Sequence, residues 1–264
     1  MFILMGLVLA FLICAALAPQ IAPKDPYAQD LSISLEAPSS DHLLGTDRYG
    51  RDLLSRVIVG SQTTVFSALA LVVIISVSGT LIGLLCGYFG GILDTILMRI
   101  ADIFLAFPGM VFAIAVAGVL SGGLWGAVVS LAVISWPKFA RLTRSRVLAI
   151  KNSSFVESLR MSGCSGAKIL FVHILPNIAG PIIVTAVLDI GTMIMELAGL
   201  SFLGLGANPP IAEWGSMMSN GRSMLQTVPW VVLAPGVAIF LTVVLFNLLG
   251  DSMRDALDPR GQKI

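Results

Sequence analysis

The sequence contains little charge. Only 12% of its 264 residues are Asp, Glu, Lys or Arg, roughly half the share found in ordinary soluble domains. The formal net charge is +1 and the basic residues are scattered, so we expect no nucleic-acid-binding surface. By contrast, 56% of the residues are hydrophobic, and the mean hydropathy is +0.94. This composition predicts a protein that crosses a membrane several times and contacts lipid over much of its surface.

Metal-ligating and catalytic side chains are also scarce. Cys14, Cys86 and Cys164 are far apart, and neither His42 nor His173 has a nearby ligand partner, so we expect no disulfide framework and no metal site. The sequence has no G-x-x-x-x-G-K-[ST] motif, which excludes ATP hydrolysis by a P-loop in this chain. A membrane enzyme would need a cluster of catalytic groups, which the sequence does not offer. We therefore expect no enzymatic activity and no cofactor in this chain.

Six apolar segments are each near the roughly 20 residues that an α-helix needs to cross a bilayer. They are residues 1–17, 65–88, 104–120, 124–140, 178–203 and 230–249. The fold expected is therefore all-α, a single membrane domain over 1–264 with six spans. Its long connections are 19–63, 138–177 and 204–229, the last of which suits a re-entrant segment. Gly79, Gly83 and Gly87 form a small-residue face that allows close helix packing.

The distribution of basic residues predicts the orientation. With the amino terminus inside, the inner connections carry eleven basic residues and the outer ones five. The inner set is Arg99, Lys138, Arg141, Arg144, Arg146, Lys151, Arg160, Lys168, Arg254, Arg260 and Lys263, and the outer set is Lys24, Arg48, Arg51, Arg56 and Arg222. The positive-inside rule then places both termini and the loop 138–177 in the cytoplasm.

The inner loop contains a polar, helical stretch, residues 153–177. Ser154 and Glu157 have the spacing of a capping box, and Gly163 is placed to end that short helix. A second helical run, 167–175, is expected to end before Pro176, which cannot continue the hydrogen-bond ladder.

One side of this first short helix is apolar. Phe155, Val156 and Leu159 lie on this side of the helix, and no other part of the loop is expected to bury them. An exposed apolar face rimmed by charge indicates a protein partner. The alternative is a connector on the membrane surface without a special role.

The same stretch carries a family motif. From Glu157 the sequence reads E-S-L-R-M-S-G, and after nine residues H-I-L-P ends at Pro176. This resembles the EAA loop of bacterial ABC importer permeases, although Ser158, Leu159 and His173 replace the usual two alanines and isoleucine. In that family the loop is a coupling helix that sits in a groove of a cytoplasmic ATPase subunit, which binds the ATP and Mg²⁺. The resemblance implies this role for Phe155, Glu157, Leu159, Gly163 and Pro176.

Three further blocks extend the resemblance. Residues 42–61 are similar to the LGTDxxGRDxxSRxxxG signature of peptide and nickel permeases, with a short amphipathic helix expected over 53–58. The blocks 198–215 and 250–260 also look like the C-type subunit of dipeptide, oligopeptide and nickel importers. By their position outside, we expect Asp47, Arg51, Asp52 and Trp214 to contact an extracytoplasmic binding protein. The alternative for the charged residues of the first block is a salt-bridged surface turn.

The fifth span contains a polar stripe. Thr185, Asp189, Thr192 and Glu196 have the spacing of one helix face. Two carboxylates at this depth are costly against lipid, so we expect the face to line a wet substrate pathway. Such a stripe would suit a cationic substrate, either a metal complex or the amino end of a peptide. The alternative is hydrogen bonding between helices.

Together the motifs resemble one half of a heteromeric import pore in the bacterial cytoplasmic membrane. The family implies a homologous second permease, two ATPase subunits, an extracytoplasmic binding protein and alternating access. Residues 188–206 look closer to the nickel branch, because peptide members more often carry the acid at the position of Leu197 and here it is Glu196. We therefore expect transport of nickel or a metal chelate, with a dipeptide or oligopeptide as the alternative. A stand-alone secondary transporter is disfavoured, since no internal repeat is evident.

Overall fold

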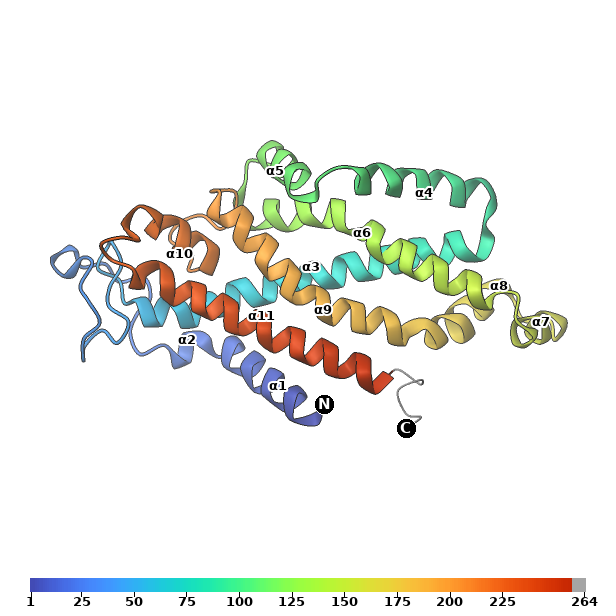
Figure 1. The fold of residues 1–264 in the computed structure, drawn as a ribbon, viewed down its shortest axis with the longest axis horizontal. Helices are drawn as coiled ribbons and strands as arrows, with labels where there is room; N and C mark the ends of the chain where they lie inside the picture. The colour runs from blue at the N-terminus through green and yellow to red at the C-terminus, as the bar shows by residue number, and fades with distance from the viewer. Residues whose placement is uncertain (258–264) are drawn as a thin grey trace.

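The computed structural model describes residues 1–257, and there all regular structure is helical apart from one isolated bridge between Thr46 and Asp52. The helices form an elongated bundle (Figure 1). In order they are α1 (Phe2–Ala16), α2 (Ala18–Ile21), η1 (Leu31–Ile33), α3 (Leu53–Phe89), α4 (Gly91–Ala106), α5 (Gly109–Val119), α6 (Gly123–Ile150), α7 (Ser154–Met161), α8 (Gly166–Lys168), η2 (Ile169–Ile174), α9 (Leu175–Phe202), α10 (Trp214–Gly221), η3 (Arg222–Met224) and α11 (Trp230–Leu257). The expected all-α fold is confirmed.

Four helical segments are long and apolar enough to cross a membrane: α3, α6, the continuous stretch Gly166–Phe202 and α11. Helices α4 and α5 pass the same test only together and are bent by 97° at their junction. Phe107 is extended there because Pro108 follows it and disfavours a helical backbone at the preceding residue. Counting this pair as one broken span gives five, and α1 is apolar but has only 15 residues. The expected number of six spans is not confirmed.

Helices α3 and α6 pack against each other along the predicted glycine face. A Cβ atom on Gly79 would lie 2.6 Å from the Cβ of Phe139, and one on Gly87 would lie 2.7 Å from the Cβ of Val147. Gly83 likewise meets the backbone of Ala140. Because no larger side chain fits, these glycines set how closely the two backbones approach, as the sequence predicts.

Helix α6 is longer than expected. It continues to Ile150, so the predicted inner loop 138–177 is helical over its first part, and the irregular connections there fall between residues 151 and 165. Arg141 and Arg144 therefore lie on a helix, where they form ion pairs with Asp102 and Asp94 of α4. The Arg144 pair is bidentate, with Nε–Oδ1 and Nη2–Oδ2 distances of 2.5 and 2.7 Å.

Two other boundaries differ from the expectation. The predicted amphipathic helix over 53–58 forms the first turns of α3, so the loop expected over 19–63 ends at Asp52. The helical run 167–175 was expected to end before Pro176. That prediction was wrong, because the run continues into α9. Residues 169–174 form a π-helix that runs without a break into α9, and Pro176 is the second residue of α9.

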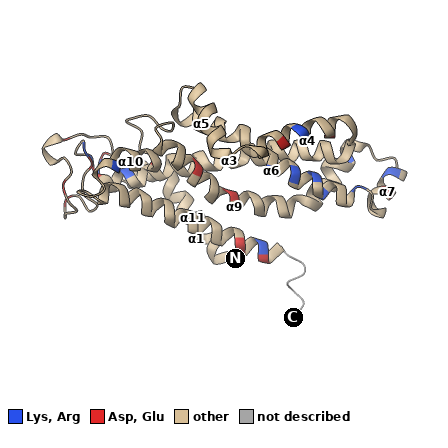
Figure 2. Ribbon diagram, turned by 45° about the horizontal axis from the view of Figure 1, so that its top comes forward, with Lys and Arg blue, Asp and Glu red and all other residues tan. Residues whose placement is uncertain are grey.

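The two ends of the bundle differ in content. We call the end with α7, α8 and η2 the α7 end, and the end with the loop 22–52, α10 and η3 the α10 end (Figure 1). The start of α1 and the last turn of α11 both point toward the α7 end (Figure 1). Lysines and arginines lie on α4 and α6, around α7 and near the end of α11, and others lie around α10 (Figure 2). Arg260 and Lys263, counted above as inner basic residues, and the end of the 250–260 motif lie outside the described residues.

Candidate functional site

Helix α7 starts at a side-chain cap. The hydroxyl oxygen of Ser153 accepts a hydrogen bond from the N–H of Val156 at 3.5 Å. Ser154 is already the first helical residue, so the predicted capping box of Ser154 and Glu157 is one residue off. Glu157 is exposed in the first turn, where a negative charge stabilises the helix dipole.

Helix α7 ends at Gly163, as predicted. Gly163 adopts φ +75°, a conformation that residues with a side chain rarely take. Its N–H donates to the carbonyl of Arg160 at 3.0 Å, and the N–H of Cys164 donates to the carbonyl of Leu159 at 3.1 Å. This pair of bonds is a Schellman motif, which fixes the direction in which the chain leaves the helix.

The apolar face predicted for α7 is divided. Val156 is fully buried and Leu159 packs against the hydrophobic core, so the protein itself covers these two residues. Phe155 remains 49% exposed and Met161 88% exposed. The Phe155 ring meets the ring of His173 edge-on at a centroid distance of 6.2 Å, which holds it in place at the tip of the α7 end. The exposed apolar surface of α7 therefore consists of Phe155 and Met161, and it is smaller than expected.

In the middle of the bundle, Asp189 of α9 is paired with Lys138 of α6. The Asp189 side chain is 2% exposed, and its Oδ1 forms an ion pair with the Nζ of Lys138, whose side chain is 53% exposed. Sequence analysis missed this pair because it assigned Lys138 to a cytoplasmic loop. A lysine that directly follows an apolar run was the available signal, since a charge within a span needs a partner.

The other members of the predicted polar stripe have different surroundings. The hydroxyl of Thr185 donates to the Pro181 carbonyl of its own helix at 2.8 Å, Thr192 is exposed, and Glu196 is partly buried. Because Lys138 neutralises Asp189, Glu196 is the carboxylate of this stripe that has no ion pair within residues 1–257. No group of three or more His, Cys, Asp or Glu side chains in that part of the chain is placed to hold a metal ion. A role of the stripe in the substrate pathway stays a prediction.

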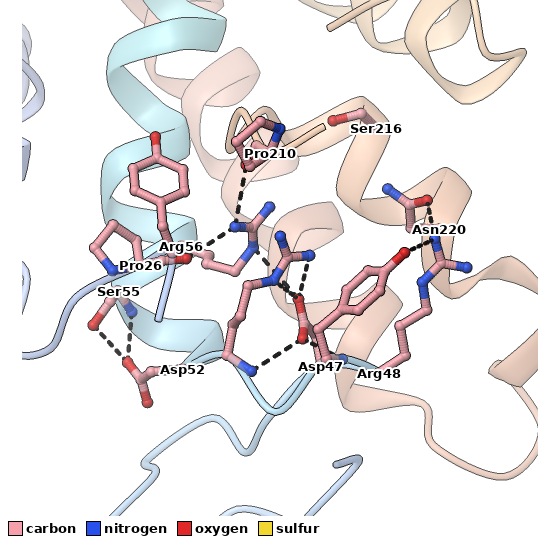
Figure 3. A network of polar contacts seen from close by, with 12 residues as sticks. Pro26, Asp47, Arg48, Asp52, Ser55, Arg56, Pro210, Ser216 and Asn220 are labelled. Atoms are coloured by element: carbon pink, nitrogen blue, oxygen red, sulfur yellow. Dashed lines mark hydrogen bonds and ion pairs between the residues drawn. The ribbon is translucent and has the colours of Figure 1, made fainter. Parts of the chain in front are cut away.

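At the α10 end, Asp47 is the centre of a buried ion-pair network (Figure 3). Its Oδ2 lies 2.7 Å from both Nε and Nη2 of Arg51 and 3.6 Å from Nε of Arg56. Its Oδ1 accepts from the backbone N–H of Tyr49 at 2.8 Å. Asp47, Arg51 and Arg56 are all buried. The alternative prediction, a salt-bridged surface turn, is therefore correct for the ion pairs. It is wrong for the location, because these residues are buried.

Asp52 caps helix α3. Its Oδ2 accepts from the N–H and the hydroxyl of Ser55 at 2.8 and 2.6 Å, and its Oδ1 lies 2.9 Å from Nδ1 of His42. Burial alone would raise the pKa of the Asp52 carboxyl, but the bonds from Ser55 and the contact with His42 bring it below its ordinary value. The carboxylate therefore stays charged and fixes the start of the longest helix.

Trp214 anchors α10 to α3. Its backbone N–H donates to the hydroxyl of Thr64 at 3.1 Å, and its indole N–H donates to the carbonyl of Val57 at 2.9 Å. The ring lies over Gly60, where an added Cβ would come within 2.9 Å of it. Trp214 is buried, like Asp47, Arg51 and Asp52. Contact of these four residues with a binding protein stays a prediction. In this structure they are buried and support the surface of the α10 end from within.

Glu213, which sequence analysis did not single out, caps α10. Its two carboxylate oxygens accept from the N–H groups of Gly215 and Ser216, each at 2.8 Å. Burial raises the pKa of this carboxyl above its ordinary value despite these bonds. An acid directly before the start of a short helix was the signal that could have identified it as a cap.

Comparison with known proteins identifies the family. Residues 79–263 match the family model "Binding-protein-dependent transport system inner membrane component". The chain belongs to this family. It is 40% identical over 259 residues to the dipeptide transport system permease protein DppC of Alkalihalophilus pseudofirmus, covering 97% of this chain and 85% of the relative. It is 46% identical over 225 residues to the glutathione transport system permease protein GsiD of Pectobacterium atrosepticum, covering 85% and 75%.

A solved structure shares the fold. The inward-facing methionine ABC transporter MetNI matches with a TM-score of 0.60 at 20% identity, covering 76% of this chain and 96% of that chain. The chain is thus an inner-membrane permease subunit of an ABC importer of the dipeptide and oligopeptide family, and it is not an enzyme. It is a multi-pass protein of the bacterial inner membrane.

Proposed function

We propose that this chain forms half of the pathway through which an ABC importer moves short peptides. The observation that carries this proposal is the similarity to relatives named as dipeptide and glutathione permeases, which extends over 97% and 85% of the chain. Nickel was expected because of the one-position placement of Glu196. That local feature weighs less than similarity along nearly the whole sequence, and the nickel reading has no support from these relatives.

The charges in the middle of the bundle also favour a peptide. A free peptide carries an ammonium at one end and a carboxylate at the other. The Lys138–Asp189 pair is neutral as a unit and leaves the Lys138 side chain half exposed, while Glu196 contributes a carboxylate on α9. A pathway lined by both signs suits a zwitterion, because its ammonium and its carboxylate can each meet a group of opposite charge.

The α7 end is proposed to couple this pathway to ATP hydrolysis. Phe155 and Met161 form an exposed apolar tip held by the cap at Gly163, which suits insertion into a groove of a cytoplasmic ATPase subunit. Two such subunits would bind the ATP and Mg²⁺, and a homologous permease would form the other half of the pore. Both termini and the α7 end would then be cytoplasmic, and the α10 end would face the extracytoplasmic binding protein. ATP binding would rock the spans between inward-open and outward-open states.

Uptake by the whole complex tests the proposal. Proteoliposomes containing this chain, its permease partner and the ATPase subunits are given the binding protein, ATP on the ATPase side, and either a labelled dipeptide, Ni²⁺ or a nickel chelate. We expect ATP-dependent uptake of the dipeptide and none of the metal forms above the level without ATP. Uptake of nickel or its chelate without uptake of any dipeptide would contradict the proposal and restore the nickel alternative.

A further inference from the structure

A groove lies between α1, α3 and α11, toward the α10 end of the bundle. Its wall includes Phe11 of α1, Ile58 of α3, Trp214 of α10 and Leu241 of α11. It leaves about 370 Å³ for the centres of atoms the size of a water molecule, many times what a single water needs. Helix α1 lies on the opposite side of the bundle from α4 and α5 (Figure 1). The groove can therefore take an extended guest on that side.

The wall of this groove offers few hydrogen bonds. The indole N–H of Trp214 donates to the carbonyl of Val57 at 2.9 Å. The hydroxyls of Ser61 and Thr242 donate to carbonyls of their own helices at 2.6 and 2.8 Å. The thiol of Cys14 is a weak donor, and the rest of the wall is apolar side chain. A polar guest would exchange water for hydrocarbon here, so the groove favours a hydrocarbon guest.

The surroundings of the groove are those of a lipid-facing surface. Helix α1 and residues 230–250 of α11 contain no charged side chain. Beside the groove, Leu9 of α1 is 61% exposed and Phe240 of α11 is 64% exposed. On α6, by contrast, the side chains of Lys138 and Arg141 are charged and half exposed, which would be costly against lipid. A protein partner is therefore expected against α6, and lipid tails against the groove.

A cation lies beside the end of the groove that is nearer α10. Ile21 of α2 lines the groove, and Lys24 follows three residues later. The backbone N–H of Lys24 donates to the hydroxyl of Ser55 at 3.0 Å, and Ser55 precedes the wall residue Ile58 by less than one turn of α3. The Lys24 ammonium is exposed and lies 3.3 Å from Nε2 of His42. An ammonium has three donors, so two remain for an anionic group.

We propose that the groove binds one phospholipid, with an acyl chain between α1 and α11 and the phosphate at Lys24. A lipid tail in a bilayer is already surrounded by hydrocarbon, so removal from water does not drive this binding. Retention of the lipid comes instead from close packing along the groove and from the contact between phosphate and ammonium. The bound lipid fills the space between α1 and the other spans. The site goes beyond the proposed transport function and is independent of which substrate the importer carries.

Native mass spectrometry of the importer complex, washed in detergent until loosely held lipid is gone, tests the groove. We expect a phospholipid to stay bound to the wild-type complex. Ala238→Phe places a ring in the groove and should lower the bound fraction at least tenfold. Val237→Phe adds the same ring at the next residue of α11, which is 52% exposed and does not line the groove, and should retain the lipid. Equal retention by the two variants would contradict the proposal.

Titration of the washed complex with two lipids tests the headgroup contact. Phosphatidylglycerol should bind about tenfold more tightly than a diacylglycerol with the same chains, because only the former has a phosphate. Lys24→Gln should abolish this preference. Arg222→Gln, which removes an exposed cation at the same end, should keep it. A preference that persists in Lys24→Gln would overturn the assignment of the phosphate to Lys24.

A cross-link from the wall identifies the occupant even if Ala238→Phe prevents assembly. Benzoylphenylalanine replaces Phe11, a wall residue of similar shape, and the washed complex is irradiated in detergent. We expect this chain to gain the mass of one phospholipid. An adduct with the second permease would assign the groove to an interface between subunits, and an adduct with detergent alone would show that no lipid is held. Either result would overturn the proposal.

Discussion

The two ends of the bundle carry family motifs of similar polarity and use them in opposite ways. At the α7 end, Glu157 is exposed and Phe155 stands half in solvent at the tip of a short capped helix. At the α10 end, Asp47, Arg51 and Asp52 are buried and bonded to one another or to backbone. A charged motif therefore stands exposed at one end of the bundle, whereas at the other end it is buried and supports a surface from within.

Glycines with positive φ show the same contrast. Gly45 and Gly163 adopt φ of +78° and +75°. A Cβ on Gly45 would lie 2.8 Å from the indole nitrogen of Trp230, whereas a Cβ on Gly163 would have nothing within 4 Å. The α10 end thus needs glycine for both conformation and space, because its loop is packed against the helices. The α7 end needs it for conformation alone.

The largest effect on stability is expected from Asp47→Asn. The change removes the carboxylate between Arg51 and Arg56 and leaves two buried guanidinium groups without it. We expect a loss of about 3–5 kcal/mol in the free energy of unfolding, seen as a lower unfolding midpoint or failed assembly of the complex. Asp41→Asn, an exposed acid of the same loop, is the control. Similar midpoints for both variants would mean that the network contributes nothing.

A smaller loss is expected where a partly exposed partner is removed. Lys138→Met leaves the Asp189 carboxylate buried and unpaired, which should cost about 1–3 kcal/mol because the lysine itself is half exposed. The double variant Lys138→Met with Asp189→Leu should recover most of the loss, since it removes both charges. Unfolding midpoints of the single, the double and an exposed control, Lys168→Met, provide the comparison. A double variant less stable than the single would contradict a simple charge pair.

At the α7 end, Gly163→Ala should cost about 1 kcal/mol, because alanine must adopt a left-handed conformation there. No clash is involved, since the space around Gly163 is open. Gly6→Ala is the matched control: it lies within α1, also with open space, and should be neutral or stabilising. Equal unfolding midpoints for the two variants would show that the end of α7 is not fixed by its cap.

The smallest effect on stability accompanies a large effect on transport. Phe155→Ser alters a side chain that is half exposed and should change the free energy of unfolding by less than about 0.5 kcal/mol. The same variant should lose ATP-dependent dipeptide uptake, because the exposed ring is the proposed anchor in the ATPase subunit. Leu31→Ser, an exposed apolar residue in the loop 22–52, is the control and should transport normally. Normal uptake by Phe155→Ser would remove the ring from coupling.

Features set by residues close together in the sequence could be predicted, whereas contacts between distant residues could not. The end of α7 at Gly163 and the packing face of α3 follow from local spacing, and both were predicted correctly. The burial of Asp47 was not, because it depends on α10, whose Asn220 is 172 residues from its partner Arg48. The Lys138–Asp189 pair was missed because Lys138 was assigned to the cytoplasmic loop, and its partner is 51 positions further along the chain. The break at Pro108 was not predicted, because the expected span 104–120 was assigned from its apolar run alone.

Photo-crosslinking in the assembled complex tests the contrast between the two ends most directly. Benzoylphenylalanine is placed at Phe155, at the α7 end, or at Leu43, which is 63% exposed at the α10 end, and the complex is irradiated with its ATPase subunits and binding protein present. The account predicts that position 155 forms an adduct with an ATPase subunit and that position 43 forms one with the binding protein. An adduct of position 155 with the binding protein, or of position 43 with an ATPase subunit, would contradict it.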